Sequence, residues 1–348
     1  RLNIYYQRGS VAAAVRHLPW DIPAMEDLGV PMVMKDFCEK LNGLVLVSGP
    51  TGSGKSTTLA SMLSYINDHK NVHILSIEDP IEYLHRHKFS IINQREIGRD
   101  APSFAAAVRQ VLRQDPDVIC IGEIRDLETV RTALTMAETG HLVMTTVHTS
   151  EAPQAISRIV DIFPPHEQQG VRTQISLSLQ GVLVQQLLPD ASGVGRCLAT
   201  ELMVANAAVR NLIRENNLQQ LRSAIETGAK EGMHTMNSSL MRSVNEKRIT
   251  EETALACTND VKGILRDLGR SGTARAARRA TAGSNRPSGW RAARPARCSR
   301  SMPPSASPAA LAVTTSKRVR WSASSRSRIS GGRGSATAAA TSTRDSDT

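Results

Sequence analysis

A glycine-rich segment that ends in a lysine and a hydroxyl side chain is the part of this sequence best suited to chemistry. Residues 49–56 read GPTGSGKS and match the pattern G-x-x-x-x-G-K-[ST]. Gly52 and Gly54 have no Cβ, so the backbone there can wrap closely around a phosphate group. Lys55 would place its charge between the β and γ phosphates, and the Ser56 hydroxyl can ligate Mg²⁺. The segment therefore predicts binding of ATP or GTP together with Mg²⁺.

Hydrolysis of a bound nucleotide also needs acidic side chains that hold Mg²⁺ and position water. Residues 78–82, EDPIE, supply Glu78 and Glu82. Residues 115–123, DPDVICIGE, lead through an apolar run to Glu123, a Walker B pattern with Gly122 where aspartate usually stands. We expect Glu123 to reach Mg²⁺, and Asp117, at the start of the predicted strand, to be structural.

Two histidines bracket a third candidate segment, residues 140–148, which read GHLVMTTVH. His141 precedes a predicted strand, and His148 follows its carboxyl end. A lone histidine is more often structural than functional, and an isolated glutamate is more often a solvated loop residue or part of an ion pair. A functional role is favoured where such a side chain directly follows a predicted strand.

Short apolar segments alternate with segments of helical spacing from residue 44 onward, which predicts a largely parallel sheet with helices on both faces. In open α/β sheets, ligands bind outside the carboxyl ends of the strands. The phosphate loop, the two glutamate segments and His148 each follow a predicted strand, so we expect them at one edge. Strands are predicted at 44–48, 72–77, 90–94, 117–121, 142–147, 182–188 and 196–204, and helices at 55–67, 103–113, 127–138, 153–160 and 168–179.

The rest of the chain divides by composition. Residues 1–19 are predicted to end an earlier unit, with a strand at 3–6 and a strand or short helix at 12–16, and 20–43 to form a linker and a helix. An α/β core at 44–204 would be followed by a small helical subdomain at 205–270. Residues 271–348 are rich in Ala, Ser and Arg, which is typical of disorder. We interpret them as a disordered basic tail or, preferably, as a frame error that begins near Arg270.

The net charge of +11 comes from this last segment. Residues 271–348 carry +13, which leaves −2 for residues 1–270. The folded part therefore lacks the basic surface expected of a nucleic-acid motor. Five isolated cysteines exclude a zinc-ribbon spacing and fit a reducing cytoplasm. No apolar run is long enough to predict a membrane span.

Four segments together carry a resemblance: residues 49–57, 77–83, 122–126 and 140–148. They are similar to the corresponding boxes of the secretion-type hexameric P-loop ATPases, which have a RecA-like core. Residues 208–215, AVRNLIRE, together with the missing four-cysteine motif, resemble the branch that powers type IV pilus retraction and twitching motility. The resemblance covers about residues 1–268.

The resemblance implies a role for each matching residue. Glu82 would be the catalytic base, Glu123 would help hold Mg²⁺ with Ser56, and His148 would sense the γ phosphate with support from His141. Arg16, with Arg1 or Arg8 as alternatives, would act in trans on a neighbour's nucleotide. Contacts with the nucleotide are expected from Gly49, Thr51, Gly52, Ser53, Gly54, Lys55, Ser56, Thr57, Glu78 and His141.

The resemblance also implies a setting. It predicts a homo-hexameric ring in the cytoplasm, at the inner-membrane base of the pilus machine, which acts on a platform protein and not directly on nucleic acid. The family has an N-terminal PAS-like domain, of which we expect only the last stretch here. The alternatives are a pilus-assembly or type II secretion ATPase, an accessory retraction paralogue, a nucleic-acid-dependent RecA-like motor, and a scaffold that binds ATP without hydrolysing it.

Overall fold

The computed structural model describes residues 2–15 and 21–269. The proposed trans-acting Arg16, its alternative Arg1, and the basic segment 271–348 therefore lie outside the described residues.

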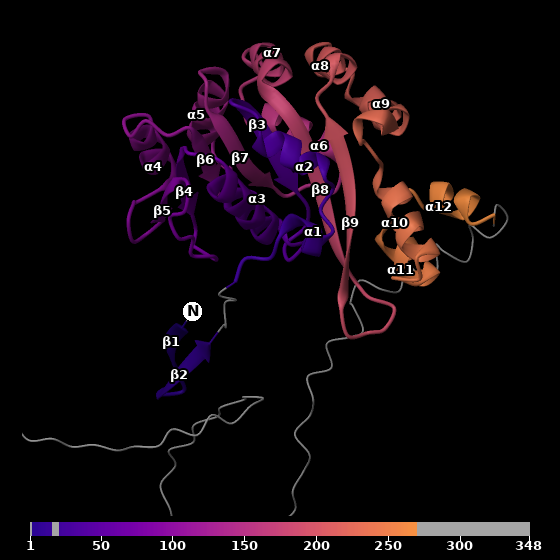
Figure 1. The fold of residues 1–348 in the computed structure, drawn as a ribbon, viewed down its shortest axis with the longest axis horizontal. Helices are drawn as coiled ribbons and strands as arrows, with labels where there is room; N and C mark the ends of the chain where they lie inside the picture. Colours follow the sequence, from indigo (N-terminus) through magenta and orange to yellow (C-terminus); the bar gives the residue numbers. More distant parts are fainter. Residues whose placement is uncertain (1, 16–20, 270–348) are drawn as a thin grey trace, which may run out of the picture. The chain divides into compact units, whose positions relative to one another are not determined.

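A seven-stranded sheet with the order β5-β4-β6-β7-β3-β8-β9 forms the centre of the fold (Figure 1). Neighbouring strands are parallel from β5 to β8, and β9 pairs antiparallel with β8. The predicted parallel sheet is confirmed. The strands are β3 (Gly43–Ser48), β4 (His73–Glu78), β5 (Ile91–Glu96), β6 (Val118–Ile121), β7 (Leu142–Val147), β8 (Leu179–Pro189) and β9 (Arg196–Val204).

Both faces of the inner strand β3 are covered, which explains its unbroken apolar sequence. Leu44 and Leu46 pack into one buried cluster with residues of α4 to α7. Val45 and Val47 point to the opposite face and pack with α2 and α3. The helices in these two layers are α1 (Met25–Leu28), α2 (Val33–Cys38), α3 (Lys55–His69), α4 (Phe104–Val111), α5 (Leu127–Glu138), α6 (Ala152–Asp161) and α7 (Gln168–Ser178).

Local signals set the ends of several helices. Ser103 caps α4 by accepting a hydrogen bond from the Ala106 N–H at 3.2 Å, as its position before the apolar run predicts. The helical spacing of residues 25–41 becomes two short helices. Gly29 ends α1 in a left-handed conformation with φ of 71°, and Pro31 follows it, so one continuous helix cannot form.

Within residues 205–269, five short α-helices follow the sheet, in agreement with the helical pattern seen beyond residue 205. Of these, α10 packs against β9, where the Ser239 hydroxyl accepts a hydrogen bond from the Thr200 N–H at 3.0 Å. The helices are α8 (Ala207–Arg214), α9 (Leu221–Thr227), α10 (Met236–Asn245), α11 (Glu251–Cys257) and α12 (Val261–Asp267).

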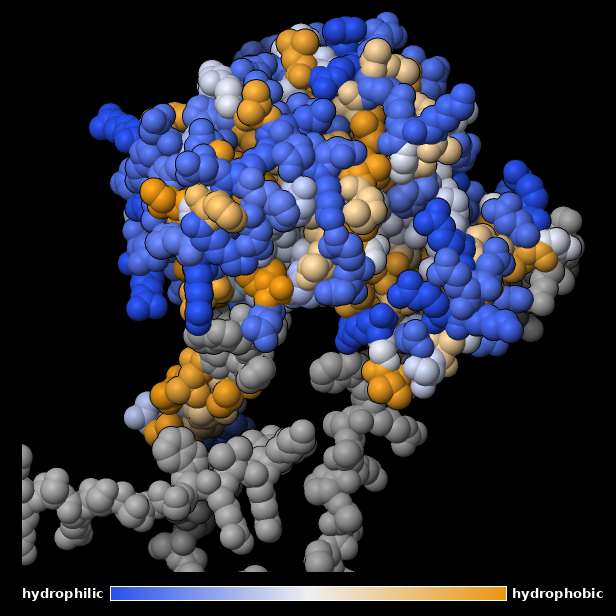
Figure 2. All heavy atoms as spheres, viewed as in Figure 1, coloured by the Kyte–Doolittle hydropathy of each residue, from blue (hydrophilic) through white to orange (hydrophobic). Residues whose placement is uncertain are grey.

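The chain begins with an antiparallel hairpin of β1 (Leu2–Gln7) and β2 (Ser10–Val15). The second segment, predicted as a strand or a short helix, is thus a strand. The exposed side chains of the hairpin are largely apolar (Figure 2). They include Ile4 and Tyr6 on β1 and Val11 on β2. Among the helices of the described residues, none has the length and hydropathy needed to cross a membrane.

Gly181 is required where β8 passes under α2. A Cβ at this position would lie 2.4 Å from the Phe37 Cζ and 2.8 Å from the Met203 carbonyl oxygen. We expect Gly181→Ala to lower the free energy of unfolding by about 1–3 kcal/mol, because a buried aromatic ring and a backbone must shift. The matched control is Gly170→Ala on the exposed surface of α7, where a Cβ meets nothing within 4 Å.

The control should stabilise the protein by about 0.5–1 kcal/mol, because alanine favours a helix over glycine. Chemical denaturation of both variants measures the two values. Equal effects of the two substitutions would contradict the packing argument.

Candidate active site

Four polar segments meet at the carboxyl edge of the sheet, as the alternating pattern predicts. The phosphate loop follows β3, Glu78 ends β4, Glu123 follows β6, and His148 follows β7. These strands lie side by side and run parallel in the order β4-β6-β7-β3. The arrangement therefore brings a phosphate-binding loop, carboxylates and an imidazole to one place.

The backbone of the phosphate loop needs glycine at three positions. Gly49, Gly52 and Gly54 have φ values of 139°, 82° and 92°, in the region that L-residues with a Cβ rarely adopt. At Gly49 there is also no space, since a Cβ would lie 2.3 Å from the Gln185 carbonyl oxygen. The loop therefore passes close to the backbone of β8 before α3 begins at Lys55.

The donors of this loop fit an anion. Gly54 is the N-cap of α3 and offers no side-chain acceptor to the first N–H groups of the helix, so these groups can bind phosphate. The Ser53 hydroxyl is buried and has no hydrogen-bond partner among the described residues. The Ser56 side chain, one position after Lys55, is exposed toward solvent. The residues present therefore fit a nucleotide, with Ser56 as a candidate ligand of its Mg²⁺.

Lys55 lies inside the loop with only 8% of its surface exposed. Its Nζ donates hydrogen bonds to the Gly49 and Pro50 carbonyl oxygens at 2.9 and 3.0 Å. Burial lowers the pKa of Lys55, and the negative charge of Glu123 acts in the opposite direction. These carbonyl acceptors carry no formal charge, and a phosphate group would supply the negative charge that favours a buried ammonium.

A chain of polar contacts links the lysine to the Walker B carboxylate. The Lys55 Nζ lies 3.3 Å from the His148 Nδ1, and the His148 Nε2 lies 3.0 Å from the Glu123 Oε1. The other carboxylate oxygen of Glu123 accepts a hydrogen bond from Arg125 at 2.6 Å. Burial pushes the pKa of Glu123 up, but the Arg125 hydrogen bond and His148 outweigh it, so the net pKa is lowered. Glu123 is thus held as a carboxylate beside the loop.

The segment that contains Glu82 reaches the loop through its neighbour Tyr83. The Tyr83 hydroxyl lies 3.0 Å from the Thr57 Oγ1 at the start of α3. Glu82 itself is half-buried. Its predicted role as catalytic base stays a prediction.

Glu78 is oriented differently from the prediction. Its carboxylate accepts hydrogen bonds from the Ser76 hydroxyl at 2.7 Å and from the Gln94 amide on β5 at 3.1 Å. Burial raises the pKa of Glu78. The side chain is directed toward β5, on the far side of β4 from the phosphate loop, so its predicted nucleotide contact has no support from this geometry.

The prediction for His141 is wrong for the nucleotide held by the same chain. The His141 carbonyl oxygen accepts a hydrogen bond from the Gly43 N–H at 3.1 Å, and Gly43 is the first residue of β3. His141 therefore lies at the amino edge of the sheet, one strand length from His148. Its ring nitrogen Nδ1 is 3.1 Å from the Met136 carbonyl oxygen, which indicates a structural role at the end of α5.

The structural interpretation of Asp117 agrees with the structure, because its carboxylate accepts a hydrogen bond from the His73 N–H at 2.8 Å. Arg8, an alternative trans-acting arginine, lies in the turn of the hairpin with φ of 49°. Its role in trans stays a prediction.

Two side-chain contacts near this edge were not predicted from the sequence. The Ser48 hydroxyl contacts the Thr149 backbone at 2.8 and 3.1 Å, which ties the end of β3 to the loop after His148. The Gln185 amide on β8 donates to the Thr58 hydroxyl at 2.7 Å. None of these four residues stands in a recognisable motif, so only the strand order could have revealed the two contacts.

The chain is similar to known proteins over most of its length. The type II/IV secretion system protein family matches residues 30–282, past residue 268, where the resemblance was expected to end. The type IV pilus retraction ATPase PilT of Pseudomonas aeruginosa is 49% identical over 254 residues, which are 73% of this chain and 74% of that protein. A twitching motility protein of Neisseria gonorrhoeae is 48% identical, over 73% of this chain and 68% of its own length.

A solved structure agrees with the fold. The crystal structure of the pilus retraction motor PilT with bound ADP has a TM-score of 0.72 and 54% sequence identity, and the match covers 76% of this chain and 75% of that one.

Proposed function

The chain belongs to the type II/IV secretion system protein family, and on that basis we propose that it is an ATPase that powers type IV pilus retraction and twitching motility. The observation that carries the proposal is the identity of 48–49% to a retraction ATPase and a twitching motility protein over 73% of the chain. The polar edge of the sheet supplies the chemistry. ATP binding is supported further by the ADP in the similar solved motor.

Each side chain of this edge has a proposed task in hydrolysis. Lys55 and the N–H groups at the start of α3 bind and orient the phosphates. Glu82 takes a proton from the attacking water. His148, placed between Lys55 and Glu123, responds to the presence of the γ phosphate. Mg²⁺, when bound by Ser56 and Glu123, supplies charge neutralisation at the phosphates.

We further propose that six copies form a ring in the cytoplasm, at the inner-membrane base of the pilus machine. Arg16 of one subunit, or Arg1 or Arg8, would complete the nucleotide site of the next subunit as a charge-neutralising finger. The ring would move a platform protein of the inner membrane. Residues 1–270 carry a charge of only −2, which supports a protein partner over nucleic acid.

Two measurements test this function. We expect the full chain to release phosphate from ATP in a Mg²⁺-dependent reaction that added single- or double-stranded DNA does not stimulate. We also expect expression in a bacterium that has type IV pili but lacks its retraction ATPase to restore twitching. Strong stimulation by DNA would favour the RecA-like nucleic-acid motor. Restored pilus assembly in an assembly mutant, without restored twitching, would favour the assembly ATPase.

A further inference from the structure

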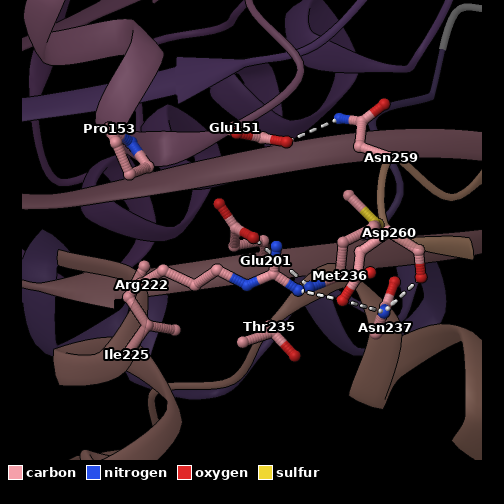
Figure 3. A pocket seen from close by; sticks show the side chains of 10 residues that line it. All are labelled: Glu151, Pro153, Glu201, Arg222, Ile225, Thr235, Met236, Asn237, Asn259 and Asp260. Carbon is pink, nitrogen blue, oxygen red and sulfur yellow. Dashed lines mark hydrogen bonds and ion pairs between the residues drawn. The ribbon is translucent and has the colours of Figure 1, made fainter. Parts of the chain in front are cut away.

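Glu201 on β9 is a buried carboxylate outside the active site. It borders a pocket between the α/β core and the short C-terminal helices (Figure 3). Only 7% of its surface is exposed. One oxygen accepts a hydrogen bond from the Ala152 N–H at 2.8 Å, and the other accepts one from the Met236 N–H at 3.4 Å.

The two donors are the first residues of two different helices. Ala152 begins α6 in the core, and Met236 begins α10 in the helical part of the chain. The amino end of a helix carries partial positive charge, which favours a nearby carboxylate. Glu201 therefore joins the amino ends of both helices through a single side chain.

The basic residue that lines this pocket, Arg222, pairs with other carboxylates, and its charge acts on Glu201 only from a distance. The Arg222 guanidinium, which points along the pocket wall (Figure 3), is paired with Asp260 and Glu226. Burial raises the pKa of Glu201, while the two backbone hydrogen bonds act in the opposite direction. Burying a carboxylate costs free energy. If this position served only for packing, an apolar side chain would give a more stable protein.

The segment before α6 is held by the active site at its other end. His148 contacts Lys55 and Glu123, and Thr149 binds the Ser48 hydroxyl immediately before the phosphate loop. Residues 148–152 thus run in five residues from His148, which contacts Lys55 of the phosphate loop, to Ala152, which donates to Glu201. A displacement of His148 can pass to Glu201 through this short segment.

The second carboxylate oxygen of Glu201 contacts the helical part of the chain through Met236. After Met236, α10 packs against β9, and residues of α10 also contact α11 and α12. Asn237 holds the loop before α12 by a hydrogen bond to the Asp260 carbonyl oxygen at 3.1 Å. A shift of the amino end of α10 therefore acts on these helices together.

We propose that Glu201 is a positioning residue that couples the nucleotide edge to the helical subdomain, by holding the amino ends of α6 and α10 on one carboxylate. This inference rests on the proposed ATPase function, because it concerns how an event at the γ phosphate reaches a distant part of the motor.

Glu201→Gln tests the coupling with little change in volume. The amide has one acceptor oxygen, so it can keep the shorter bond to Ala152 but faces the Met236 N–H with a donor group. The matched control is Glu226→Gln on α9, which removes an exposed carboxylate of the same helical part. Hydrogen exchange of the full chain is measured without nucleotide, with ADP, and with a non-hydrolysable ATP analogue.

A second pair of variants removes the backbone donor itself. Met236→Pro deletes the N–H at the first position of α10, where proline fits a helix, and the preceding Thr235 is already extended with ψ of 161°. Met236→Ala removes the same side chain but keeps the N–H. Any difference between these two variants reports the hydrogen bond to Glu201 and not the packing of the methionine.

We expect the two ligands to change exchange at the start of α10 by different amounts in the wild type, by about threefold or more. Glu201→Gln and Met236→Pro should lose this difference and about fivefold or more of ATP turnover, with nucleotide affinity retained. Glu226→Gln and Met236→Ala should keep the difference between the two ligands and most of the wild-type turnover, although Met236→Ala also lowers stability because Met236 is buried.

Two results separate the two proposals. A wild type that binds the nucleotides but shows no difference at α10, or a Glu201→Gln protein that keeps the difference, overturns the coupling. A wild type that binds neither nucleotide overturns the proposed ATPase function.

Discussion

Lys55→Ala is expected to reduce phosphate release by at least about a hundredfold and to abolish measurable nucleotide binding. The Lys55 ammonium is buried within the loop, bound to the Gly49 and Pro50 carbonyl oxygens and placed next to His148. It is the cation closest to where the phosphates must lie. Alanine removes from the loop the lysine charge that balances the β and γ phosphates.

Lys70→Ala at the other end of α3 is the matched control. Lys70 donates to the Cys38 carbonyl oxygen at 2.6 Å and pairs with Glu39 at 3.3 Å, so its loss should lower the free energy of unfolding by about 1 kcal/mol. Its turnover should stay near the wild-type value. Calorimetric titration with ADP and a phosphate-release assay measure both variants. Nucleotide affinity in Lys55→Ala equal to that of Lys70→Ala would refute the assignment of the loop.

The fold could be predicted closely because its strong signals are local. The strands are short apolar runs buried on both faces, and the predicted limits of α5 and β7 agree with the structure. The early helices were less predictable. The periodic spacing of residues 25–41 favours one helix, and the left-handed Gly29 divides it. The hairpin strand β2 could not be distinguished from a helix, because its three alanines favour a helix while Val11 and Val15 on either side favour a strand.

The site could be predicted only where a motif coincides with a strand end. The phosphate loop, Glu123 and His148 each follow a strand, so the parallel topology brings them together. His141 belongs to the same sequence motif as His148, but a strand separates them, and a strand carries its two ends to opposite edges of a sheet. His141 and His148 therefore lie at opposite edges of the sheet, although they belong to one sequence motif.

Contacts made through the backbone could not be predicted at all. Glu201 accepts hydrogen bonds from two backbone N–H groups that lie 49 and 35 residues away in the chain. Every residue except proline has a backbone N–H, so the pattern of side chains does not indicate which ones will donate. The orientation of Glu78 could not be predicted for a different reason, because it depends on which strand lies next to β4. Its partner Gln94 lies on the neighbouring strand β5, and the order of strands cannot be obtained from the spacing of acidic residues.

Glu82→Gln and Glu123→Gln should both slow hydrolysis, but for different reasons. In Glu82→Gln the proposed base is lost while the phosphate loop is untouched. We expect kcat to fall by about 10²–10⁴-fold with little change in ATP affinity. The exposed pair of Glu128 with Arg109 offers the control Glu128→Gln, which should leave kcat unchanged.

Glu123→Gln should instead weaken the binding of Mg²⁺ and release His148. The carboxylate accepts from Arg125 with one oxygen and contacts His148 with the other, and an amide can accept through only one atom. Because the lost function is a charge that attracts the metal ion, raising the Mg²⁺ concentration should restore part of the turnover of Glu123→Gln. It should restore none in Glu82→Gln, where the missing group acts on water. Titration of phosphate release with Mg²⁺ separates the two variants. Equal rescue of both variants by Mg²⁺ would show that the two glutamates do not have separate roles. Unchanged phosphate release in both variants would show that neither glutamate takes part in hydrolysis.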